Sequence, residues 1–220
     1  MPLRARIVTW LDDKSRPARN RSAVGTLFLN SVSPWDSFVS RLYFNAGSKD
    51  WAAIQHGPEH TASVVEGLKA MPFTPTRILE LGCGAGGGAA EAAKLFPDAH
   101  IVGIDFAKKM IDRANELHAS DKVSFEVATV EGYSGEFDLV MWLNCQAYPA
   151  SLRRFLKPGG AVLNAGTFQG RTSALVEEHF KSFGFTLLSW ANVGAGFYEL
   201  YRVDDVDAAT AKVFDPKRRP

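Results

Sequence analysis

The sequence predicts an α/β fold in which a mostly parallel sheet is covered by helices on both faces. Apolar strand-like runs alternate with helical segments from residue 77 onward, which is the pattern of strands joined by crossover helices. The last two apolar runs are separated by only four residues, so they must pair as an antiparallel hairpin. A chain of 220 residues with 46% hydrophobic residues suffices for one core, so we expect a single domain.

Two helices are expected ahead of the sheet, each with a proline-marked start. Ser33 precedes Pro34, and Gly57 precedes Pro58, which places a proline at the first position of each helix. The second helix should end before Pro72. Seven strands then follow, at residues 77–81, 100–104, 123–127, 139–143, 161–164, 186–192 and 197–203. Further helices are expected at residues 88–96, 108–118, 150–155 and 172–183.

Charge and cysteine content narrow the class of protein. Lys and Arg number 25 against 24 Asp and Glu, so the net charge gives no reason to expect nucleic acid or an anionic membrane as a partner. Cys83 and Cys145 do not make a disulfide framework, and packing explains them better than a redox switch. No apolar run approaches the ~20 residues that span a bilayer, and the first residues lack the apolar stretch of a secretory signal. We therefore expect a cytoplasmic protein.

Residues 82–88 contain five glycines in seven positions and lie between a strand-like run and an alanine-rich helical segment. This composition indicates a tight turn that admits a ligand close to its backbone and faces the free N–H groups of a helix. The spacing Gly82-x-Gly84-x-Gly86 suits a methyl-donor site, whereas Gly82-x-Gly84-x-x-Gly87 suits a dinucleotide site. The glycines alone leave both open.

Two carboxylates favour the methyl donor. Glu80 lies two residues before the first glycine, where it would attract a cationic ligand and repel a pyrophosphate. Asp105 closes the next strand, 23 residues after Gly82, and could accept hydrogen bonds from both ribose hydroxyls. Each residue also has a structural alternative, because Glu80 could cap a neighbouring helix and Asp105 could cap the helix at 108–118.

From residue 35 to residue 203 the chain resembles the class I S-adenosylmethionine-dependent methyltransferases. The resemblance rests on ELGCGAG at 80–86, Asp105, EFDLVMWLN at 136–144, LKPGG at 156–160 and the terminal hairpin. It implies a Rossmann-like three-layer sandwich with a mostly parallel seven-stranded sheet and S-adenosyl-L-methionine as the cofactor. It does not identify the methyl acceptor.

The resemblance also implies a role for individual residues. Gly82, Gly84 and Gly86 would admit the methionyl part of the cofactor, Asp105 would hold the ribose, and Phe106 would border the adenine. Thr129 and the amide of Val130 stand where family members often place an acidic adenine ligand. Asn144 would lie beside the sulfonium and the acceptor, although a loop asparagine is as often a turn former. The full set implied to contact the cofactor is Glu80, Gly82, Cys83, Gly84, Gly86, Asp105, Phe106, Met110, Thr129, Val130 and Asn144.

Catalysis of methyl transfer depends mainly on alignment of donor and nucleophile, so a general base is optional. The catalytic candidates are His56, His60 and Asn144, and surface histidines are the alternative for the first two. No third ligand accompanies the histidine pair, so no metal site is expected. Four aromatic residues could line an acceptor pocket or belong to the core: Tyr43, Trp51, Trp142 and Tyr148.

The sequence thus predicts a small-molecule methyltransferase that acts on oxygen or nitrogen. The alternatives are an RNA or protein methyltransferase, for which the basic ends are the support, and a non-catalytic cofactor-binding partner subunit. We divide the chain into an N-terminal arm or leader at 1–30, a single methyltransferase domain at 31–205 and a basic C-terminal tail at 206–220. Within the domain, residues 31–72 form a helical cap and residues 77–205 form the cofactor-binding core.

Overall fold

The structure is a computed structural model that describes residues 41, 44–46, 48–145, 149–167 and 174–204. The predicted N-terminal arm, the predicted helix start at Ser33 and the predicted C-terminal tail lie outside the described residues. The same holds for Tyr43 and Tyr148. The division into an arm, a domain and a tail therefore stays a prediction.

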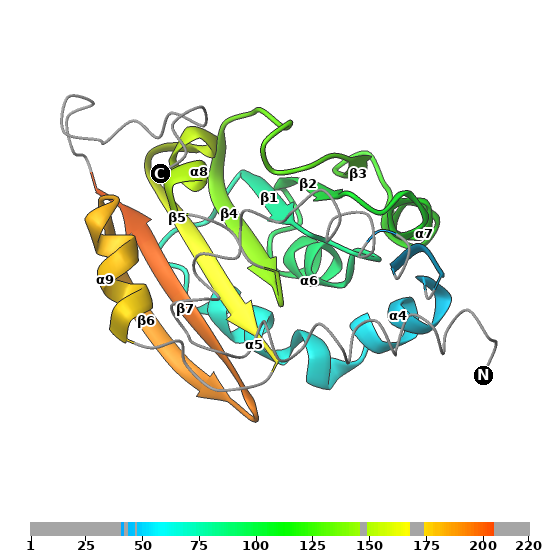
Figure 1. Ribbon diagram of the computed structural model, residues 1–220, viewed down its shortest axis with the longest axis horizontal. Coiled ribbons are helices and arrows are strands. Elements are labelled where there is room, and N and C mark those ends of the chain that lie inside the picture. The colour runs from blue at the N-terminus through cyan, green and yellow to red at the C-terminus, as the bar shows by residue number, and fades with distance from the viewer. Residues whose placement is uncertain (1–40, 42–43, 47, 146–148, 168–173, 205–220) are drawn as a thin grey trace.

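A seven-stranded sheet with the strand order β3-β2-β1-β4-β5-β7-β6 forms the middle layer (Figure 1). Strands β1 to β5 run parallel, whereas β7 runs antiparallel to both β5 and β6. The bounds are β1 (Arg77–Leu81), β2 (His100–Asp105), β3 (Val123–Val127), β4 (Phe137–Leu143), β5 (Leu156–Gly166), β6 (Phe185–Val193) and β7 (Gly196–Val203). The predicted fold class, including the closing hairpin, is confirmed.

The order of the strands reverses between β1 and β4. The chain passes from β1 outward through β2 and β3 and then returns to pair β4 with the free side of β1. Ligands of open α/β sheets bind outside the carboxyl ends of the strands at such a point. The glycine loop after β1, Asp105 at the end of β2 and Asn144 after β4 all lie at this place.

Helices cover both faces of the sheet, and each face has its own apolar core. Because the central strands are buried on both faces, they are nearly continuous apolar runs. One core takes residues from α5 (Pro58–Lys69), α6 (Gly87–Leu95) and α7 (Lys108–His118). The other takes residues from α8 (Pro149–Leu152), the 3₁₀ helix η1 (Arg153–Phe155) and α9 (Ala174–Ser182).

Helix α4 (Ser48–Gln55) packs on other helices, with contacts to α7 and α5. Figure 1 places it beside α7, at the opposite end of the molecule from α9. A third apolar cluster joins Ala52 of α4 to Ala85 of the glycine loop and to Ala107 and Met110 at the start of α7. Helix α4 is therefore attached to the two loops that follow β1 and β2.

Asp138 links the amino ends of β1, β4 and β5 through hydrogen bonds and an ion pair. Its Oδ2 accepts hydrogen bonds from the backbone N–H of Thr76 and Arg77, both at 2.8 Å, and from the Thr76 hydroxyl at 2.6 Å. Its Oδ1 forms an ion pair with Lys157 Nζ at 2.8 Å. One carboxylate on β4 thus fixes the start of β1 and the start of β5, at the edge of the sheet away from the glycine loop.

Several element bounds differ from the sequence-based expectation. The chain enters β5 at Leu156 rather than at residue 161, because Leu156 already pairs with Phe137 before a register irregularity in β4. The helix expected at 150–155 begins at Pro149 and tightens to a 3₁₀ turn from Arg153. Helix α4 was not predicted as a separate element. The expected start of α5 is confirmed, with Gly57 as the N-cap residue and Pro58 in the first turn.

No helix among the described residues is long and apolar enough to cross a bilayer.

Candidate functional site

The glycine loop between β1 and α6 has left-handed backbone conformations at Gly82, Gly84 and Gly86, with φ values of 63°, 54° and 86°. A Cβ at Gly84 would lie 2.5 Å from both ends of the Gln55 side-chain amide. A Cβ at Gly82 would lie 2.7 Å from the Cys145 sulfur. The glycines therefore serve the close packing of the chain's own segments, in addition to any role toward a ligand.

Glu80 is buried, with 2% of its surface exposed, and its Oε2 accepts a hydrogen bond from the backbone N–H of Ala89 at 2.8 Å. Ala89 lies in the first turn of α6, so the carboxyl group caps that helix. Burial raises the pKa of Glu80 to about 8, the Ala89 hydrogen bond opposes the rise, and the nearby Asp105 adds to it. The capping alternative that the sequence left open is thus observed, and attraction of a cationic ligand stays a prediction.

Asp105 connects the glycine loop to the start of α7. Its Oδ2 accepts a hydrogen bond from Gly84 N at 3.0 Å, and its Oδ1 accepts one from Ala107 N at 2.8 Å. Burial raises the pKa of Asp105, and the backbone hydrogen bonds from Ala107, Gly84 and Phe106 oppose that rise. A carboxylate offers about four acceptor positions, so beside these three backbone donors about one is left for another donor. This capacity fits a ribose hydroxyl.

The side chains near Asp105 are half-buried or buried. The Phe106 ring is half-buried and contacts Phe44 edge to face at 6.2 Å between centroids. Met110 and Cys83 are almost fully buried in apolar clusters, and burial raises the pKa of the Cys83 thiol well above its ordinary value. The Met110 and Cys83 side chains therefore contribute to packing.

The segment after β3 contributes Thr129 and Val130. The Thr129 hydroxyl accepts a hydrogen bond from Gly132 N at 3.2 Å within the local turn. The Val130 carbonyl accepts one from the Arg154 guanidinium. Both residues lie after the carboxyl end of β3, as predicted, and adenine binding there stays a prediction.

Asn144 follows β4 and is the one non-glycine residue with a positive φ in the described part of the chain, at 57°. Its Oδ1 accepts a hydrogen bond from Thr167 N at 2.9 Å, and its Nδ2 donates to Thr167 Oγ1 at 3.0 Å. The side chain is exposed and ties the end of β4 to the end of β5. The structure thus shows Asn144 as a turn former, and contact with donor or acceptor stays a prediction.

The two candidate histidines have different surroundings. His56 Nε2 lies 2.5 Å from Nε2 of His118 in α7, and the His56 Nδ1–H donates to the Ala52 carbonyl. His60 lines a small cavity together with Gln55 and Glu80. Its pKa is lowered by burial and then by the neighbouring His56. Of the two, His60 is the one that faces the glycine loop region.

The structure describes only some of the aromatic residues that were predicted to line a pocket for the methyl acceptor. Trp142 is buried among the apolar residues of the α9 face, with its ring stacked on Phe180 at 6.4 Å. It contributes to the core, which is the alternative that the sequence left open. Trp51 lies in α4, and its side chain is outside the described part of the structure.

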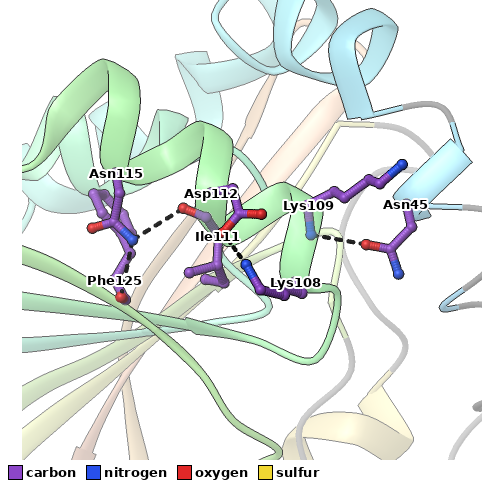
Figure 2. A network of polar contacts seen from close by, with 7 residues as sticks. All are labelled: Asn45, Lys108, Lys109, Ile111, Asp112, Asn115 and Phe125. Atoms are coloured by element: carbon purple, nitrogen blue, oxygen red, sulfur yellow. Dashed lines mark hydrogen bonds and ion pairs between the residues drawn. The ribbon is translucent and has the colours of Figure 1, made fainter.

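Gln55 and Asn45 were missed by the sequence interpretation. Gln55 Oε1 accepts a hydrogen bond from Ala85 N at 2.8 Å. Asn45 Oδ1 accepts one from Lys109 N, also at 2.8 Å, so it caps the first turn of α7 from the preceding segment (Figure 2). Neither residue belongs to a motif, and both contacts join segments far apart in the sequence. No local signal could have found them.

Within the described residues, no group of three or more His, Cys, Asp or Glu side chains could hold a metal ion. The polar groups described at this site are backbone N–H groups, two carboxyl groups, the side-chain amides of Gln55, Asn45 and Asn144, and the histidines.

Comparison with known proteins gives a consistent set of relatives. Residues 78–160 match a family model described as a methyltransferase domain. Phosphoethanolamine N-methyltransferase 1 of Arabidopsis thaliana is 35% identical over 170 residues, which cover 69% of this chain and 34% of that protein. Malonyl-[acyl-carrier protein] O-methyltransferase of Legionella pneumophila is 32% identical over 103 residues, which cover 45% of this chain and 36% of that protein.

The chain thus spans about a third of the length of these curated relatives. Among solved structures, magnesium protoporphyrin IX methyltransferase from Synechocystis PCC 6803 with bound SAM has a TM-score of 0.63 at 17% identity. That likeness covers 77% of this chain and 97% of the other. At this level of identity it concerns the fold.

Proposed function

Because the chain belongs to the class I S-adenosylmethionine-dependent methyltransferase superfamily, whose cofactor is S-adenosylmethionine, we propose that it methylates a small, partly apolar molecule on oxygen or nitrogen. The observation that carries the proposal is the position of Asp105. Its carboxylate holds the glycine loop at Gly84 and the next loop at Ala107, at the point where the strand order reverses.

The residues that the sequence predicts to hold the methyl donor are compatible with such a cofactor. When bound, S-adenosylmethionine supplies a methyl group on a positively charged sulfur. Asp105 would accept a hydrogen bond from the ribose with its remaining acceptor position. Phe106, which is half-buried, would border the adenine, and the left-handed conformations at Gly82 and Gly84 would shape the loop beside the cofactor. Glu80 would add negative potential beneath the loop when ionised.

The chain's own residues would act chiefly by orientation. Alignment of two reactants is worth about 7–11 kcal/mol of a barrier, whereas a general base adds about 10²–10⁴-fold. His60 is the better placed candidate for a base, because His56 is engaged with His118 and Ala52. Asn144, fixed by Thr167, would position the acceptor at the end of β4.

The relatives support a small acceptor. The named reactions of the two curated relatives are methylation of phosphoethanolamine on nitrogen and of a malonyl carrier conjugate on oxygen. An RNA acceptor is supported only by the basic ends of the sequence, whereas the malonyl relative acts on a group that a protein carries. A small-molecule partner is therefore part of the proposal.

Binding measurements test the cofactor assignment. Calorimetry should show binding of S-adenosylmethionine and S-adenosylhomocysteine and none of NAD. Tight NAD binding without a response to the other two would contradict the proposal. A transfer assay with metabolite extract, in which the product gains one methylene in mass, would then identify the acceptor.

Asp105→Ala tests the residue on which the proposal rests. The variant loses the acceptors for Gly84 N–H and Ala107 N–H as well as any ribose contact, so we expect S-adenosylhomocysteine affinity to fall by about tenfold or more. Asp105→Asn, which keeps one acceptor oxygen, is the matched control and should lose less. Unchanged affinity in a folded Asp105→Ala would remove the ribose assignment.

A further inference from the structure

The backbone N–H groups of Gly84 and Ala85 are held by two side chains from different elements. Asp105, at the end of β2, accepts from Gly84 N at 3.0 Å, and Gln55, at the end of α4, accepts from Ala85 N at 2.8 Å. Ala85 is fully buried, so its N–H has no access to water if the Gln55 acceptor is lost. An unpaired buried donor is costly, and the loop would have to shift to satisfy it.

Gln55 also fills the space that the glycines leave. Its side-chain amide lies against Gly84, where a Cβ would come within 2.5 Å, and its backbone carbonyl lies against Gly87 in the first turn of α6. Together with His60 and Glu80 it lines the small cavity beside the loop. The Gln55 side chain thus covers the glycine loop on the side that faces α4.

Helix α4 is held in place independently of Gln55. Ala52 packs in the cluster with Ala85, Ala107 and Met110, and His56 contacts His118 of α7. Because these contacts fix the end of the helix, the Gln55 amide does not need its own hydrogen bond to Ala85 to stay in place. Gln55 can therefore transmit the position of α4 to the loop.

We propose that Gln55 is a positioning residue for the methyl donor: it fixes the glycine loop through Ala85 N–H and thereby aligns Gly84 with Asp105. This inference rests on the proposed function. A shift of Ala85 moves the adjacent Gly84, which is hydrogen-bonded to Asp105, so loss of the Gln55 acceptor disturbs the carboxylate expected to hold the ribose.

Gln55→Met and Gln55→Glu separate the hydrogen bond from the packing. Methionine has similar length and fills the space at Gly84 but offers no oxygen acceptor. We expect Gln55→Met to weaken S-adenosylhomocysteine binding in calorimetry by about tenfold. Hydrogen exchange of the Ala85 amide in the ligand-free protein should become faster. Gln55→Glu keeps an acceptor oxygen, so Ala85 should stay protected and the loss of affinity should be smaller.

Ile54→Ala is the control, because Ile54 is the preceding residue of α4 and 53% of its surface is exposed. It should leave affinity and exchange unchanged. A folded Gln55→Met or Gln55→Ala with wild-type or tighter affinity would overturn this inference and leave the proposed function standing. A loss of melting temperature without a change in affinity would do the same. Absence of S-adenosylhomocysteine and S-adenosylmethionine binding by the wild-type protein would overturn both.

Discussion

At the scale of single residues, two buried carboxyl groups organise the candidate site through the backbone. Glu80 holds an N–H at the start of α6, while Asp105 holds one N–H in the glycine loop and another at the start of α7. The two carboxyl groups differ in the number of backbone donors: Asp105 has three, whereas Glu80 has one. Burial raises the pKa of both, that of Glu80 to about 8.

Glu80→Gln tests this ionisation. The pKa of Glu80 in the folded protein lies above its ordinary value of 4.5, so the folded state binds the proton more tightly than the unfolded state. The free energy of unfolding of the wild type, relative to Glu80→Gln, should therefore fall as pH rises from about 4.5 to about 8 and then level off. Urea unfolding across this range measures it. Parallel curves for the two proteins would show that the pKa of Glu80 is the same in the folded and unfolded states.

The sequence predicted the positions of these carboxylates and left helix capping open as an alternative for both, but it did not identify the amides that they hold. Their place before and after the glycine loop follows from spacing along strands, which is a local property of the chain. The amide that each carboxyl group holds depends on how the following turn folds back, and several acceptors compete for it. Gln55 and Asn45 lie outside any motif and could not be predicted, since their hydrogen bonds depend on the tertiary position of the segment that carries them.

At the scale of elements, the strands of the sheet follow from local sequence, whereas α4 depends on tertiary contacts. The strands 77–81 and 123–127 and the helix 108–118 were predicted with the bounds that the structure shows, because their apolar periodicity is strong. Helix α4 has a composition that is neither apolar nor clearly amphipathic, and tertiary contacts with Ala85, Ala107 and His118 stabilise it. The β5 bounds were missed because pairing with β4 extends the strand through two glycines.

The contact between α4 and α7 should weaken in acid. The pKa of His118 is lowered by burial, then by His56 and Lys94, and Glu91 opposes the change. The pKa of His60 is also lowered, by burial and by His56. A histidine with a lowered pKa stabilises the fold above its unfolded pKa of about 6.5, and that stability is lost as pH falls.

We therefore expect hydrogen exchange of α4 amides, corrected for intrinsic rates, to speed up between about pH 7.5 and about pH 5.5, on either side of the ordinary histidine pKa. His118→Leu removes the partner of His56, so α4 should exchange faster already at the higher pH and respond less to acid. An equal response of the two proteins to acid would show that the histidine pair does not hold the helix.

Asp138 provides a test at the amino ends of the strands, opposite the candidate site. Burial alone would raise its pKa, but the hydrogen bonds from Lys157, Thr76 and Arg77 outweigh burial and hold the pKa well below the usual range. Its contribution is thus present above the ordinary aspartate pKa of 3.8 and lost as pH falls below it. Asp138→Ala should lower the free energy of unfolding near neutral pH by about 2 kcal/mol in urea denaturation, because the Thr76 and Arg77 N–H groups lose a charged acceptor.

Asp138→Ala should leave S-adenosylhomocysteine affinity unchanged at a temperature where the variant is folded, since Asp138 lies at the amino ends of the strands. If Asp138→Ala lost affinity as well as stability, the amino and carboxyl ends of the strands would be coupled.

At the scale of the whole molecule, the reversal of strand order places the candidate site at the carboxyl ends of β1, β2 and β4, and α4 lies beside it there. The end of β1, the end of β2 and α4 meet around Ala85, Ala107 and Ala52. The β6–β7 hairpin packs with α5 and α9 on the other side of the sheet centre. A ligand at the reversal point should therefore stabilise the first region directly and the hairpin only through global unfolding.

This arrangement predicts a ligand effect that is both large and localised. At a concentration of about 100 times its Kd, S-adenosylhomocysteine should stabilise the folded state by about 2.7 kcal/mol, because it binds the native state alone. For a domain of this size that corresponds to a rise in Tm of about 5–10 °C, and NAD at the same concentration should give none. In native hydrogen exchange, the added protection should be greatest at residues 82–88, residues 105–108 and α4. Protection concentrated in β6 and β7 instead would place the ligand away from the reversal point and would contradict the assignment of Asp105, because its carboxylate lies on the β1 and β2 side of the sheet.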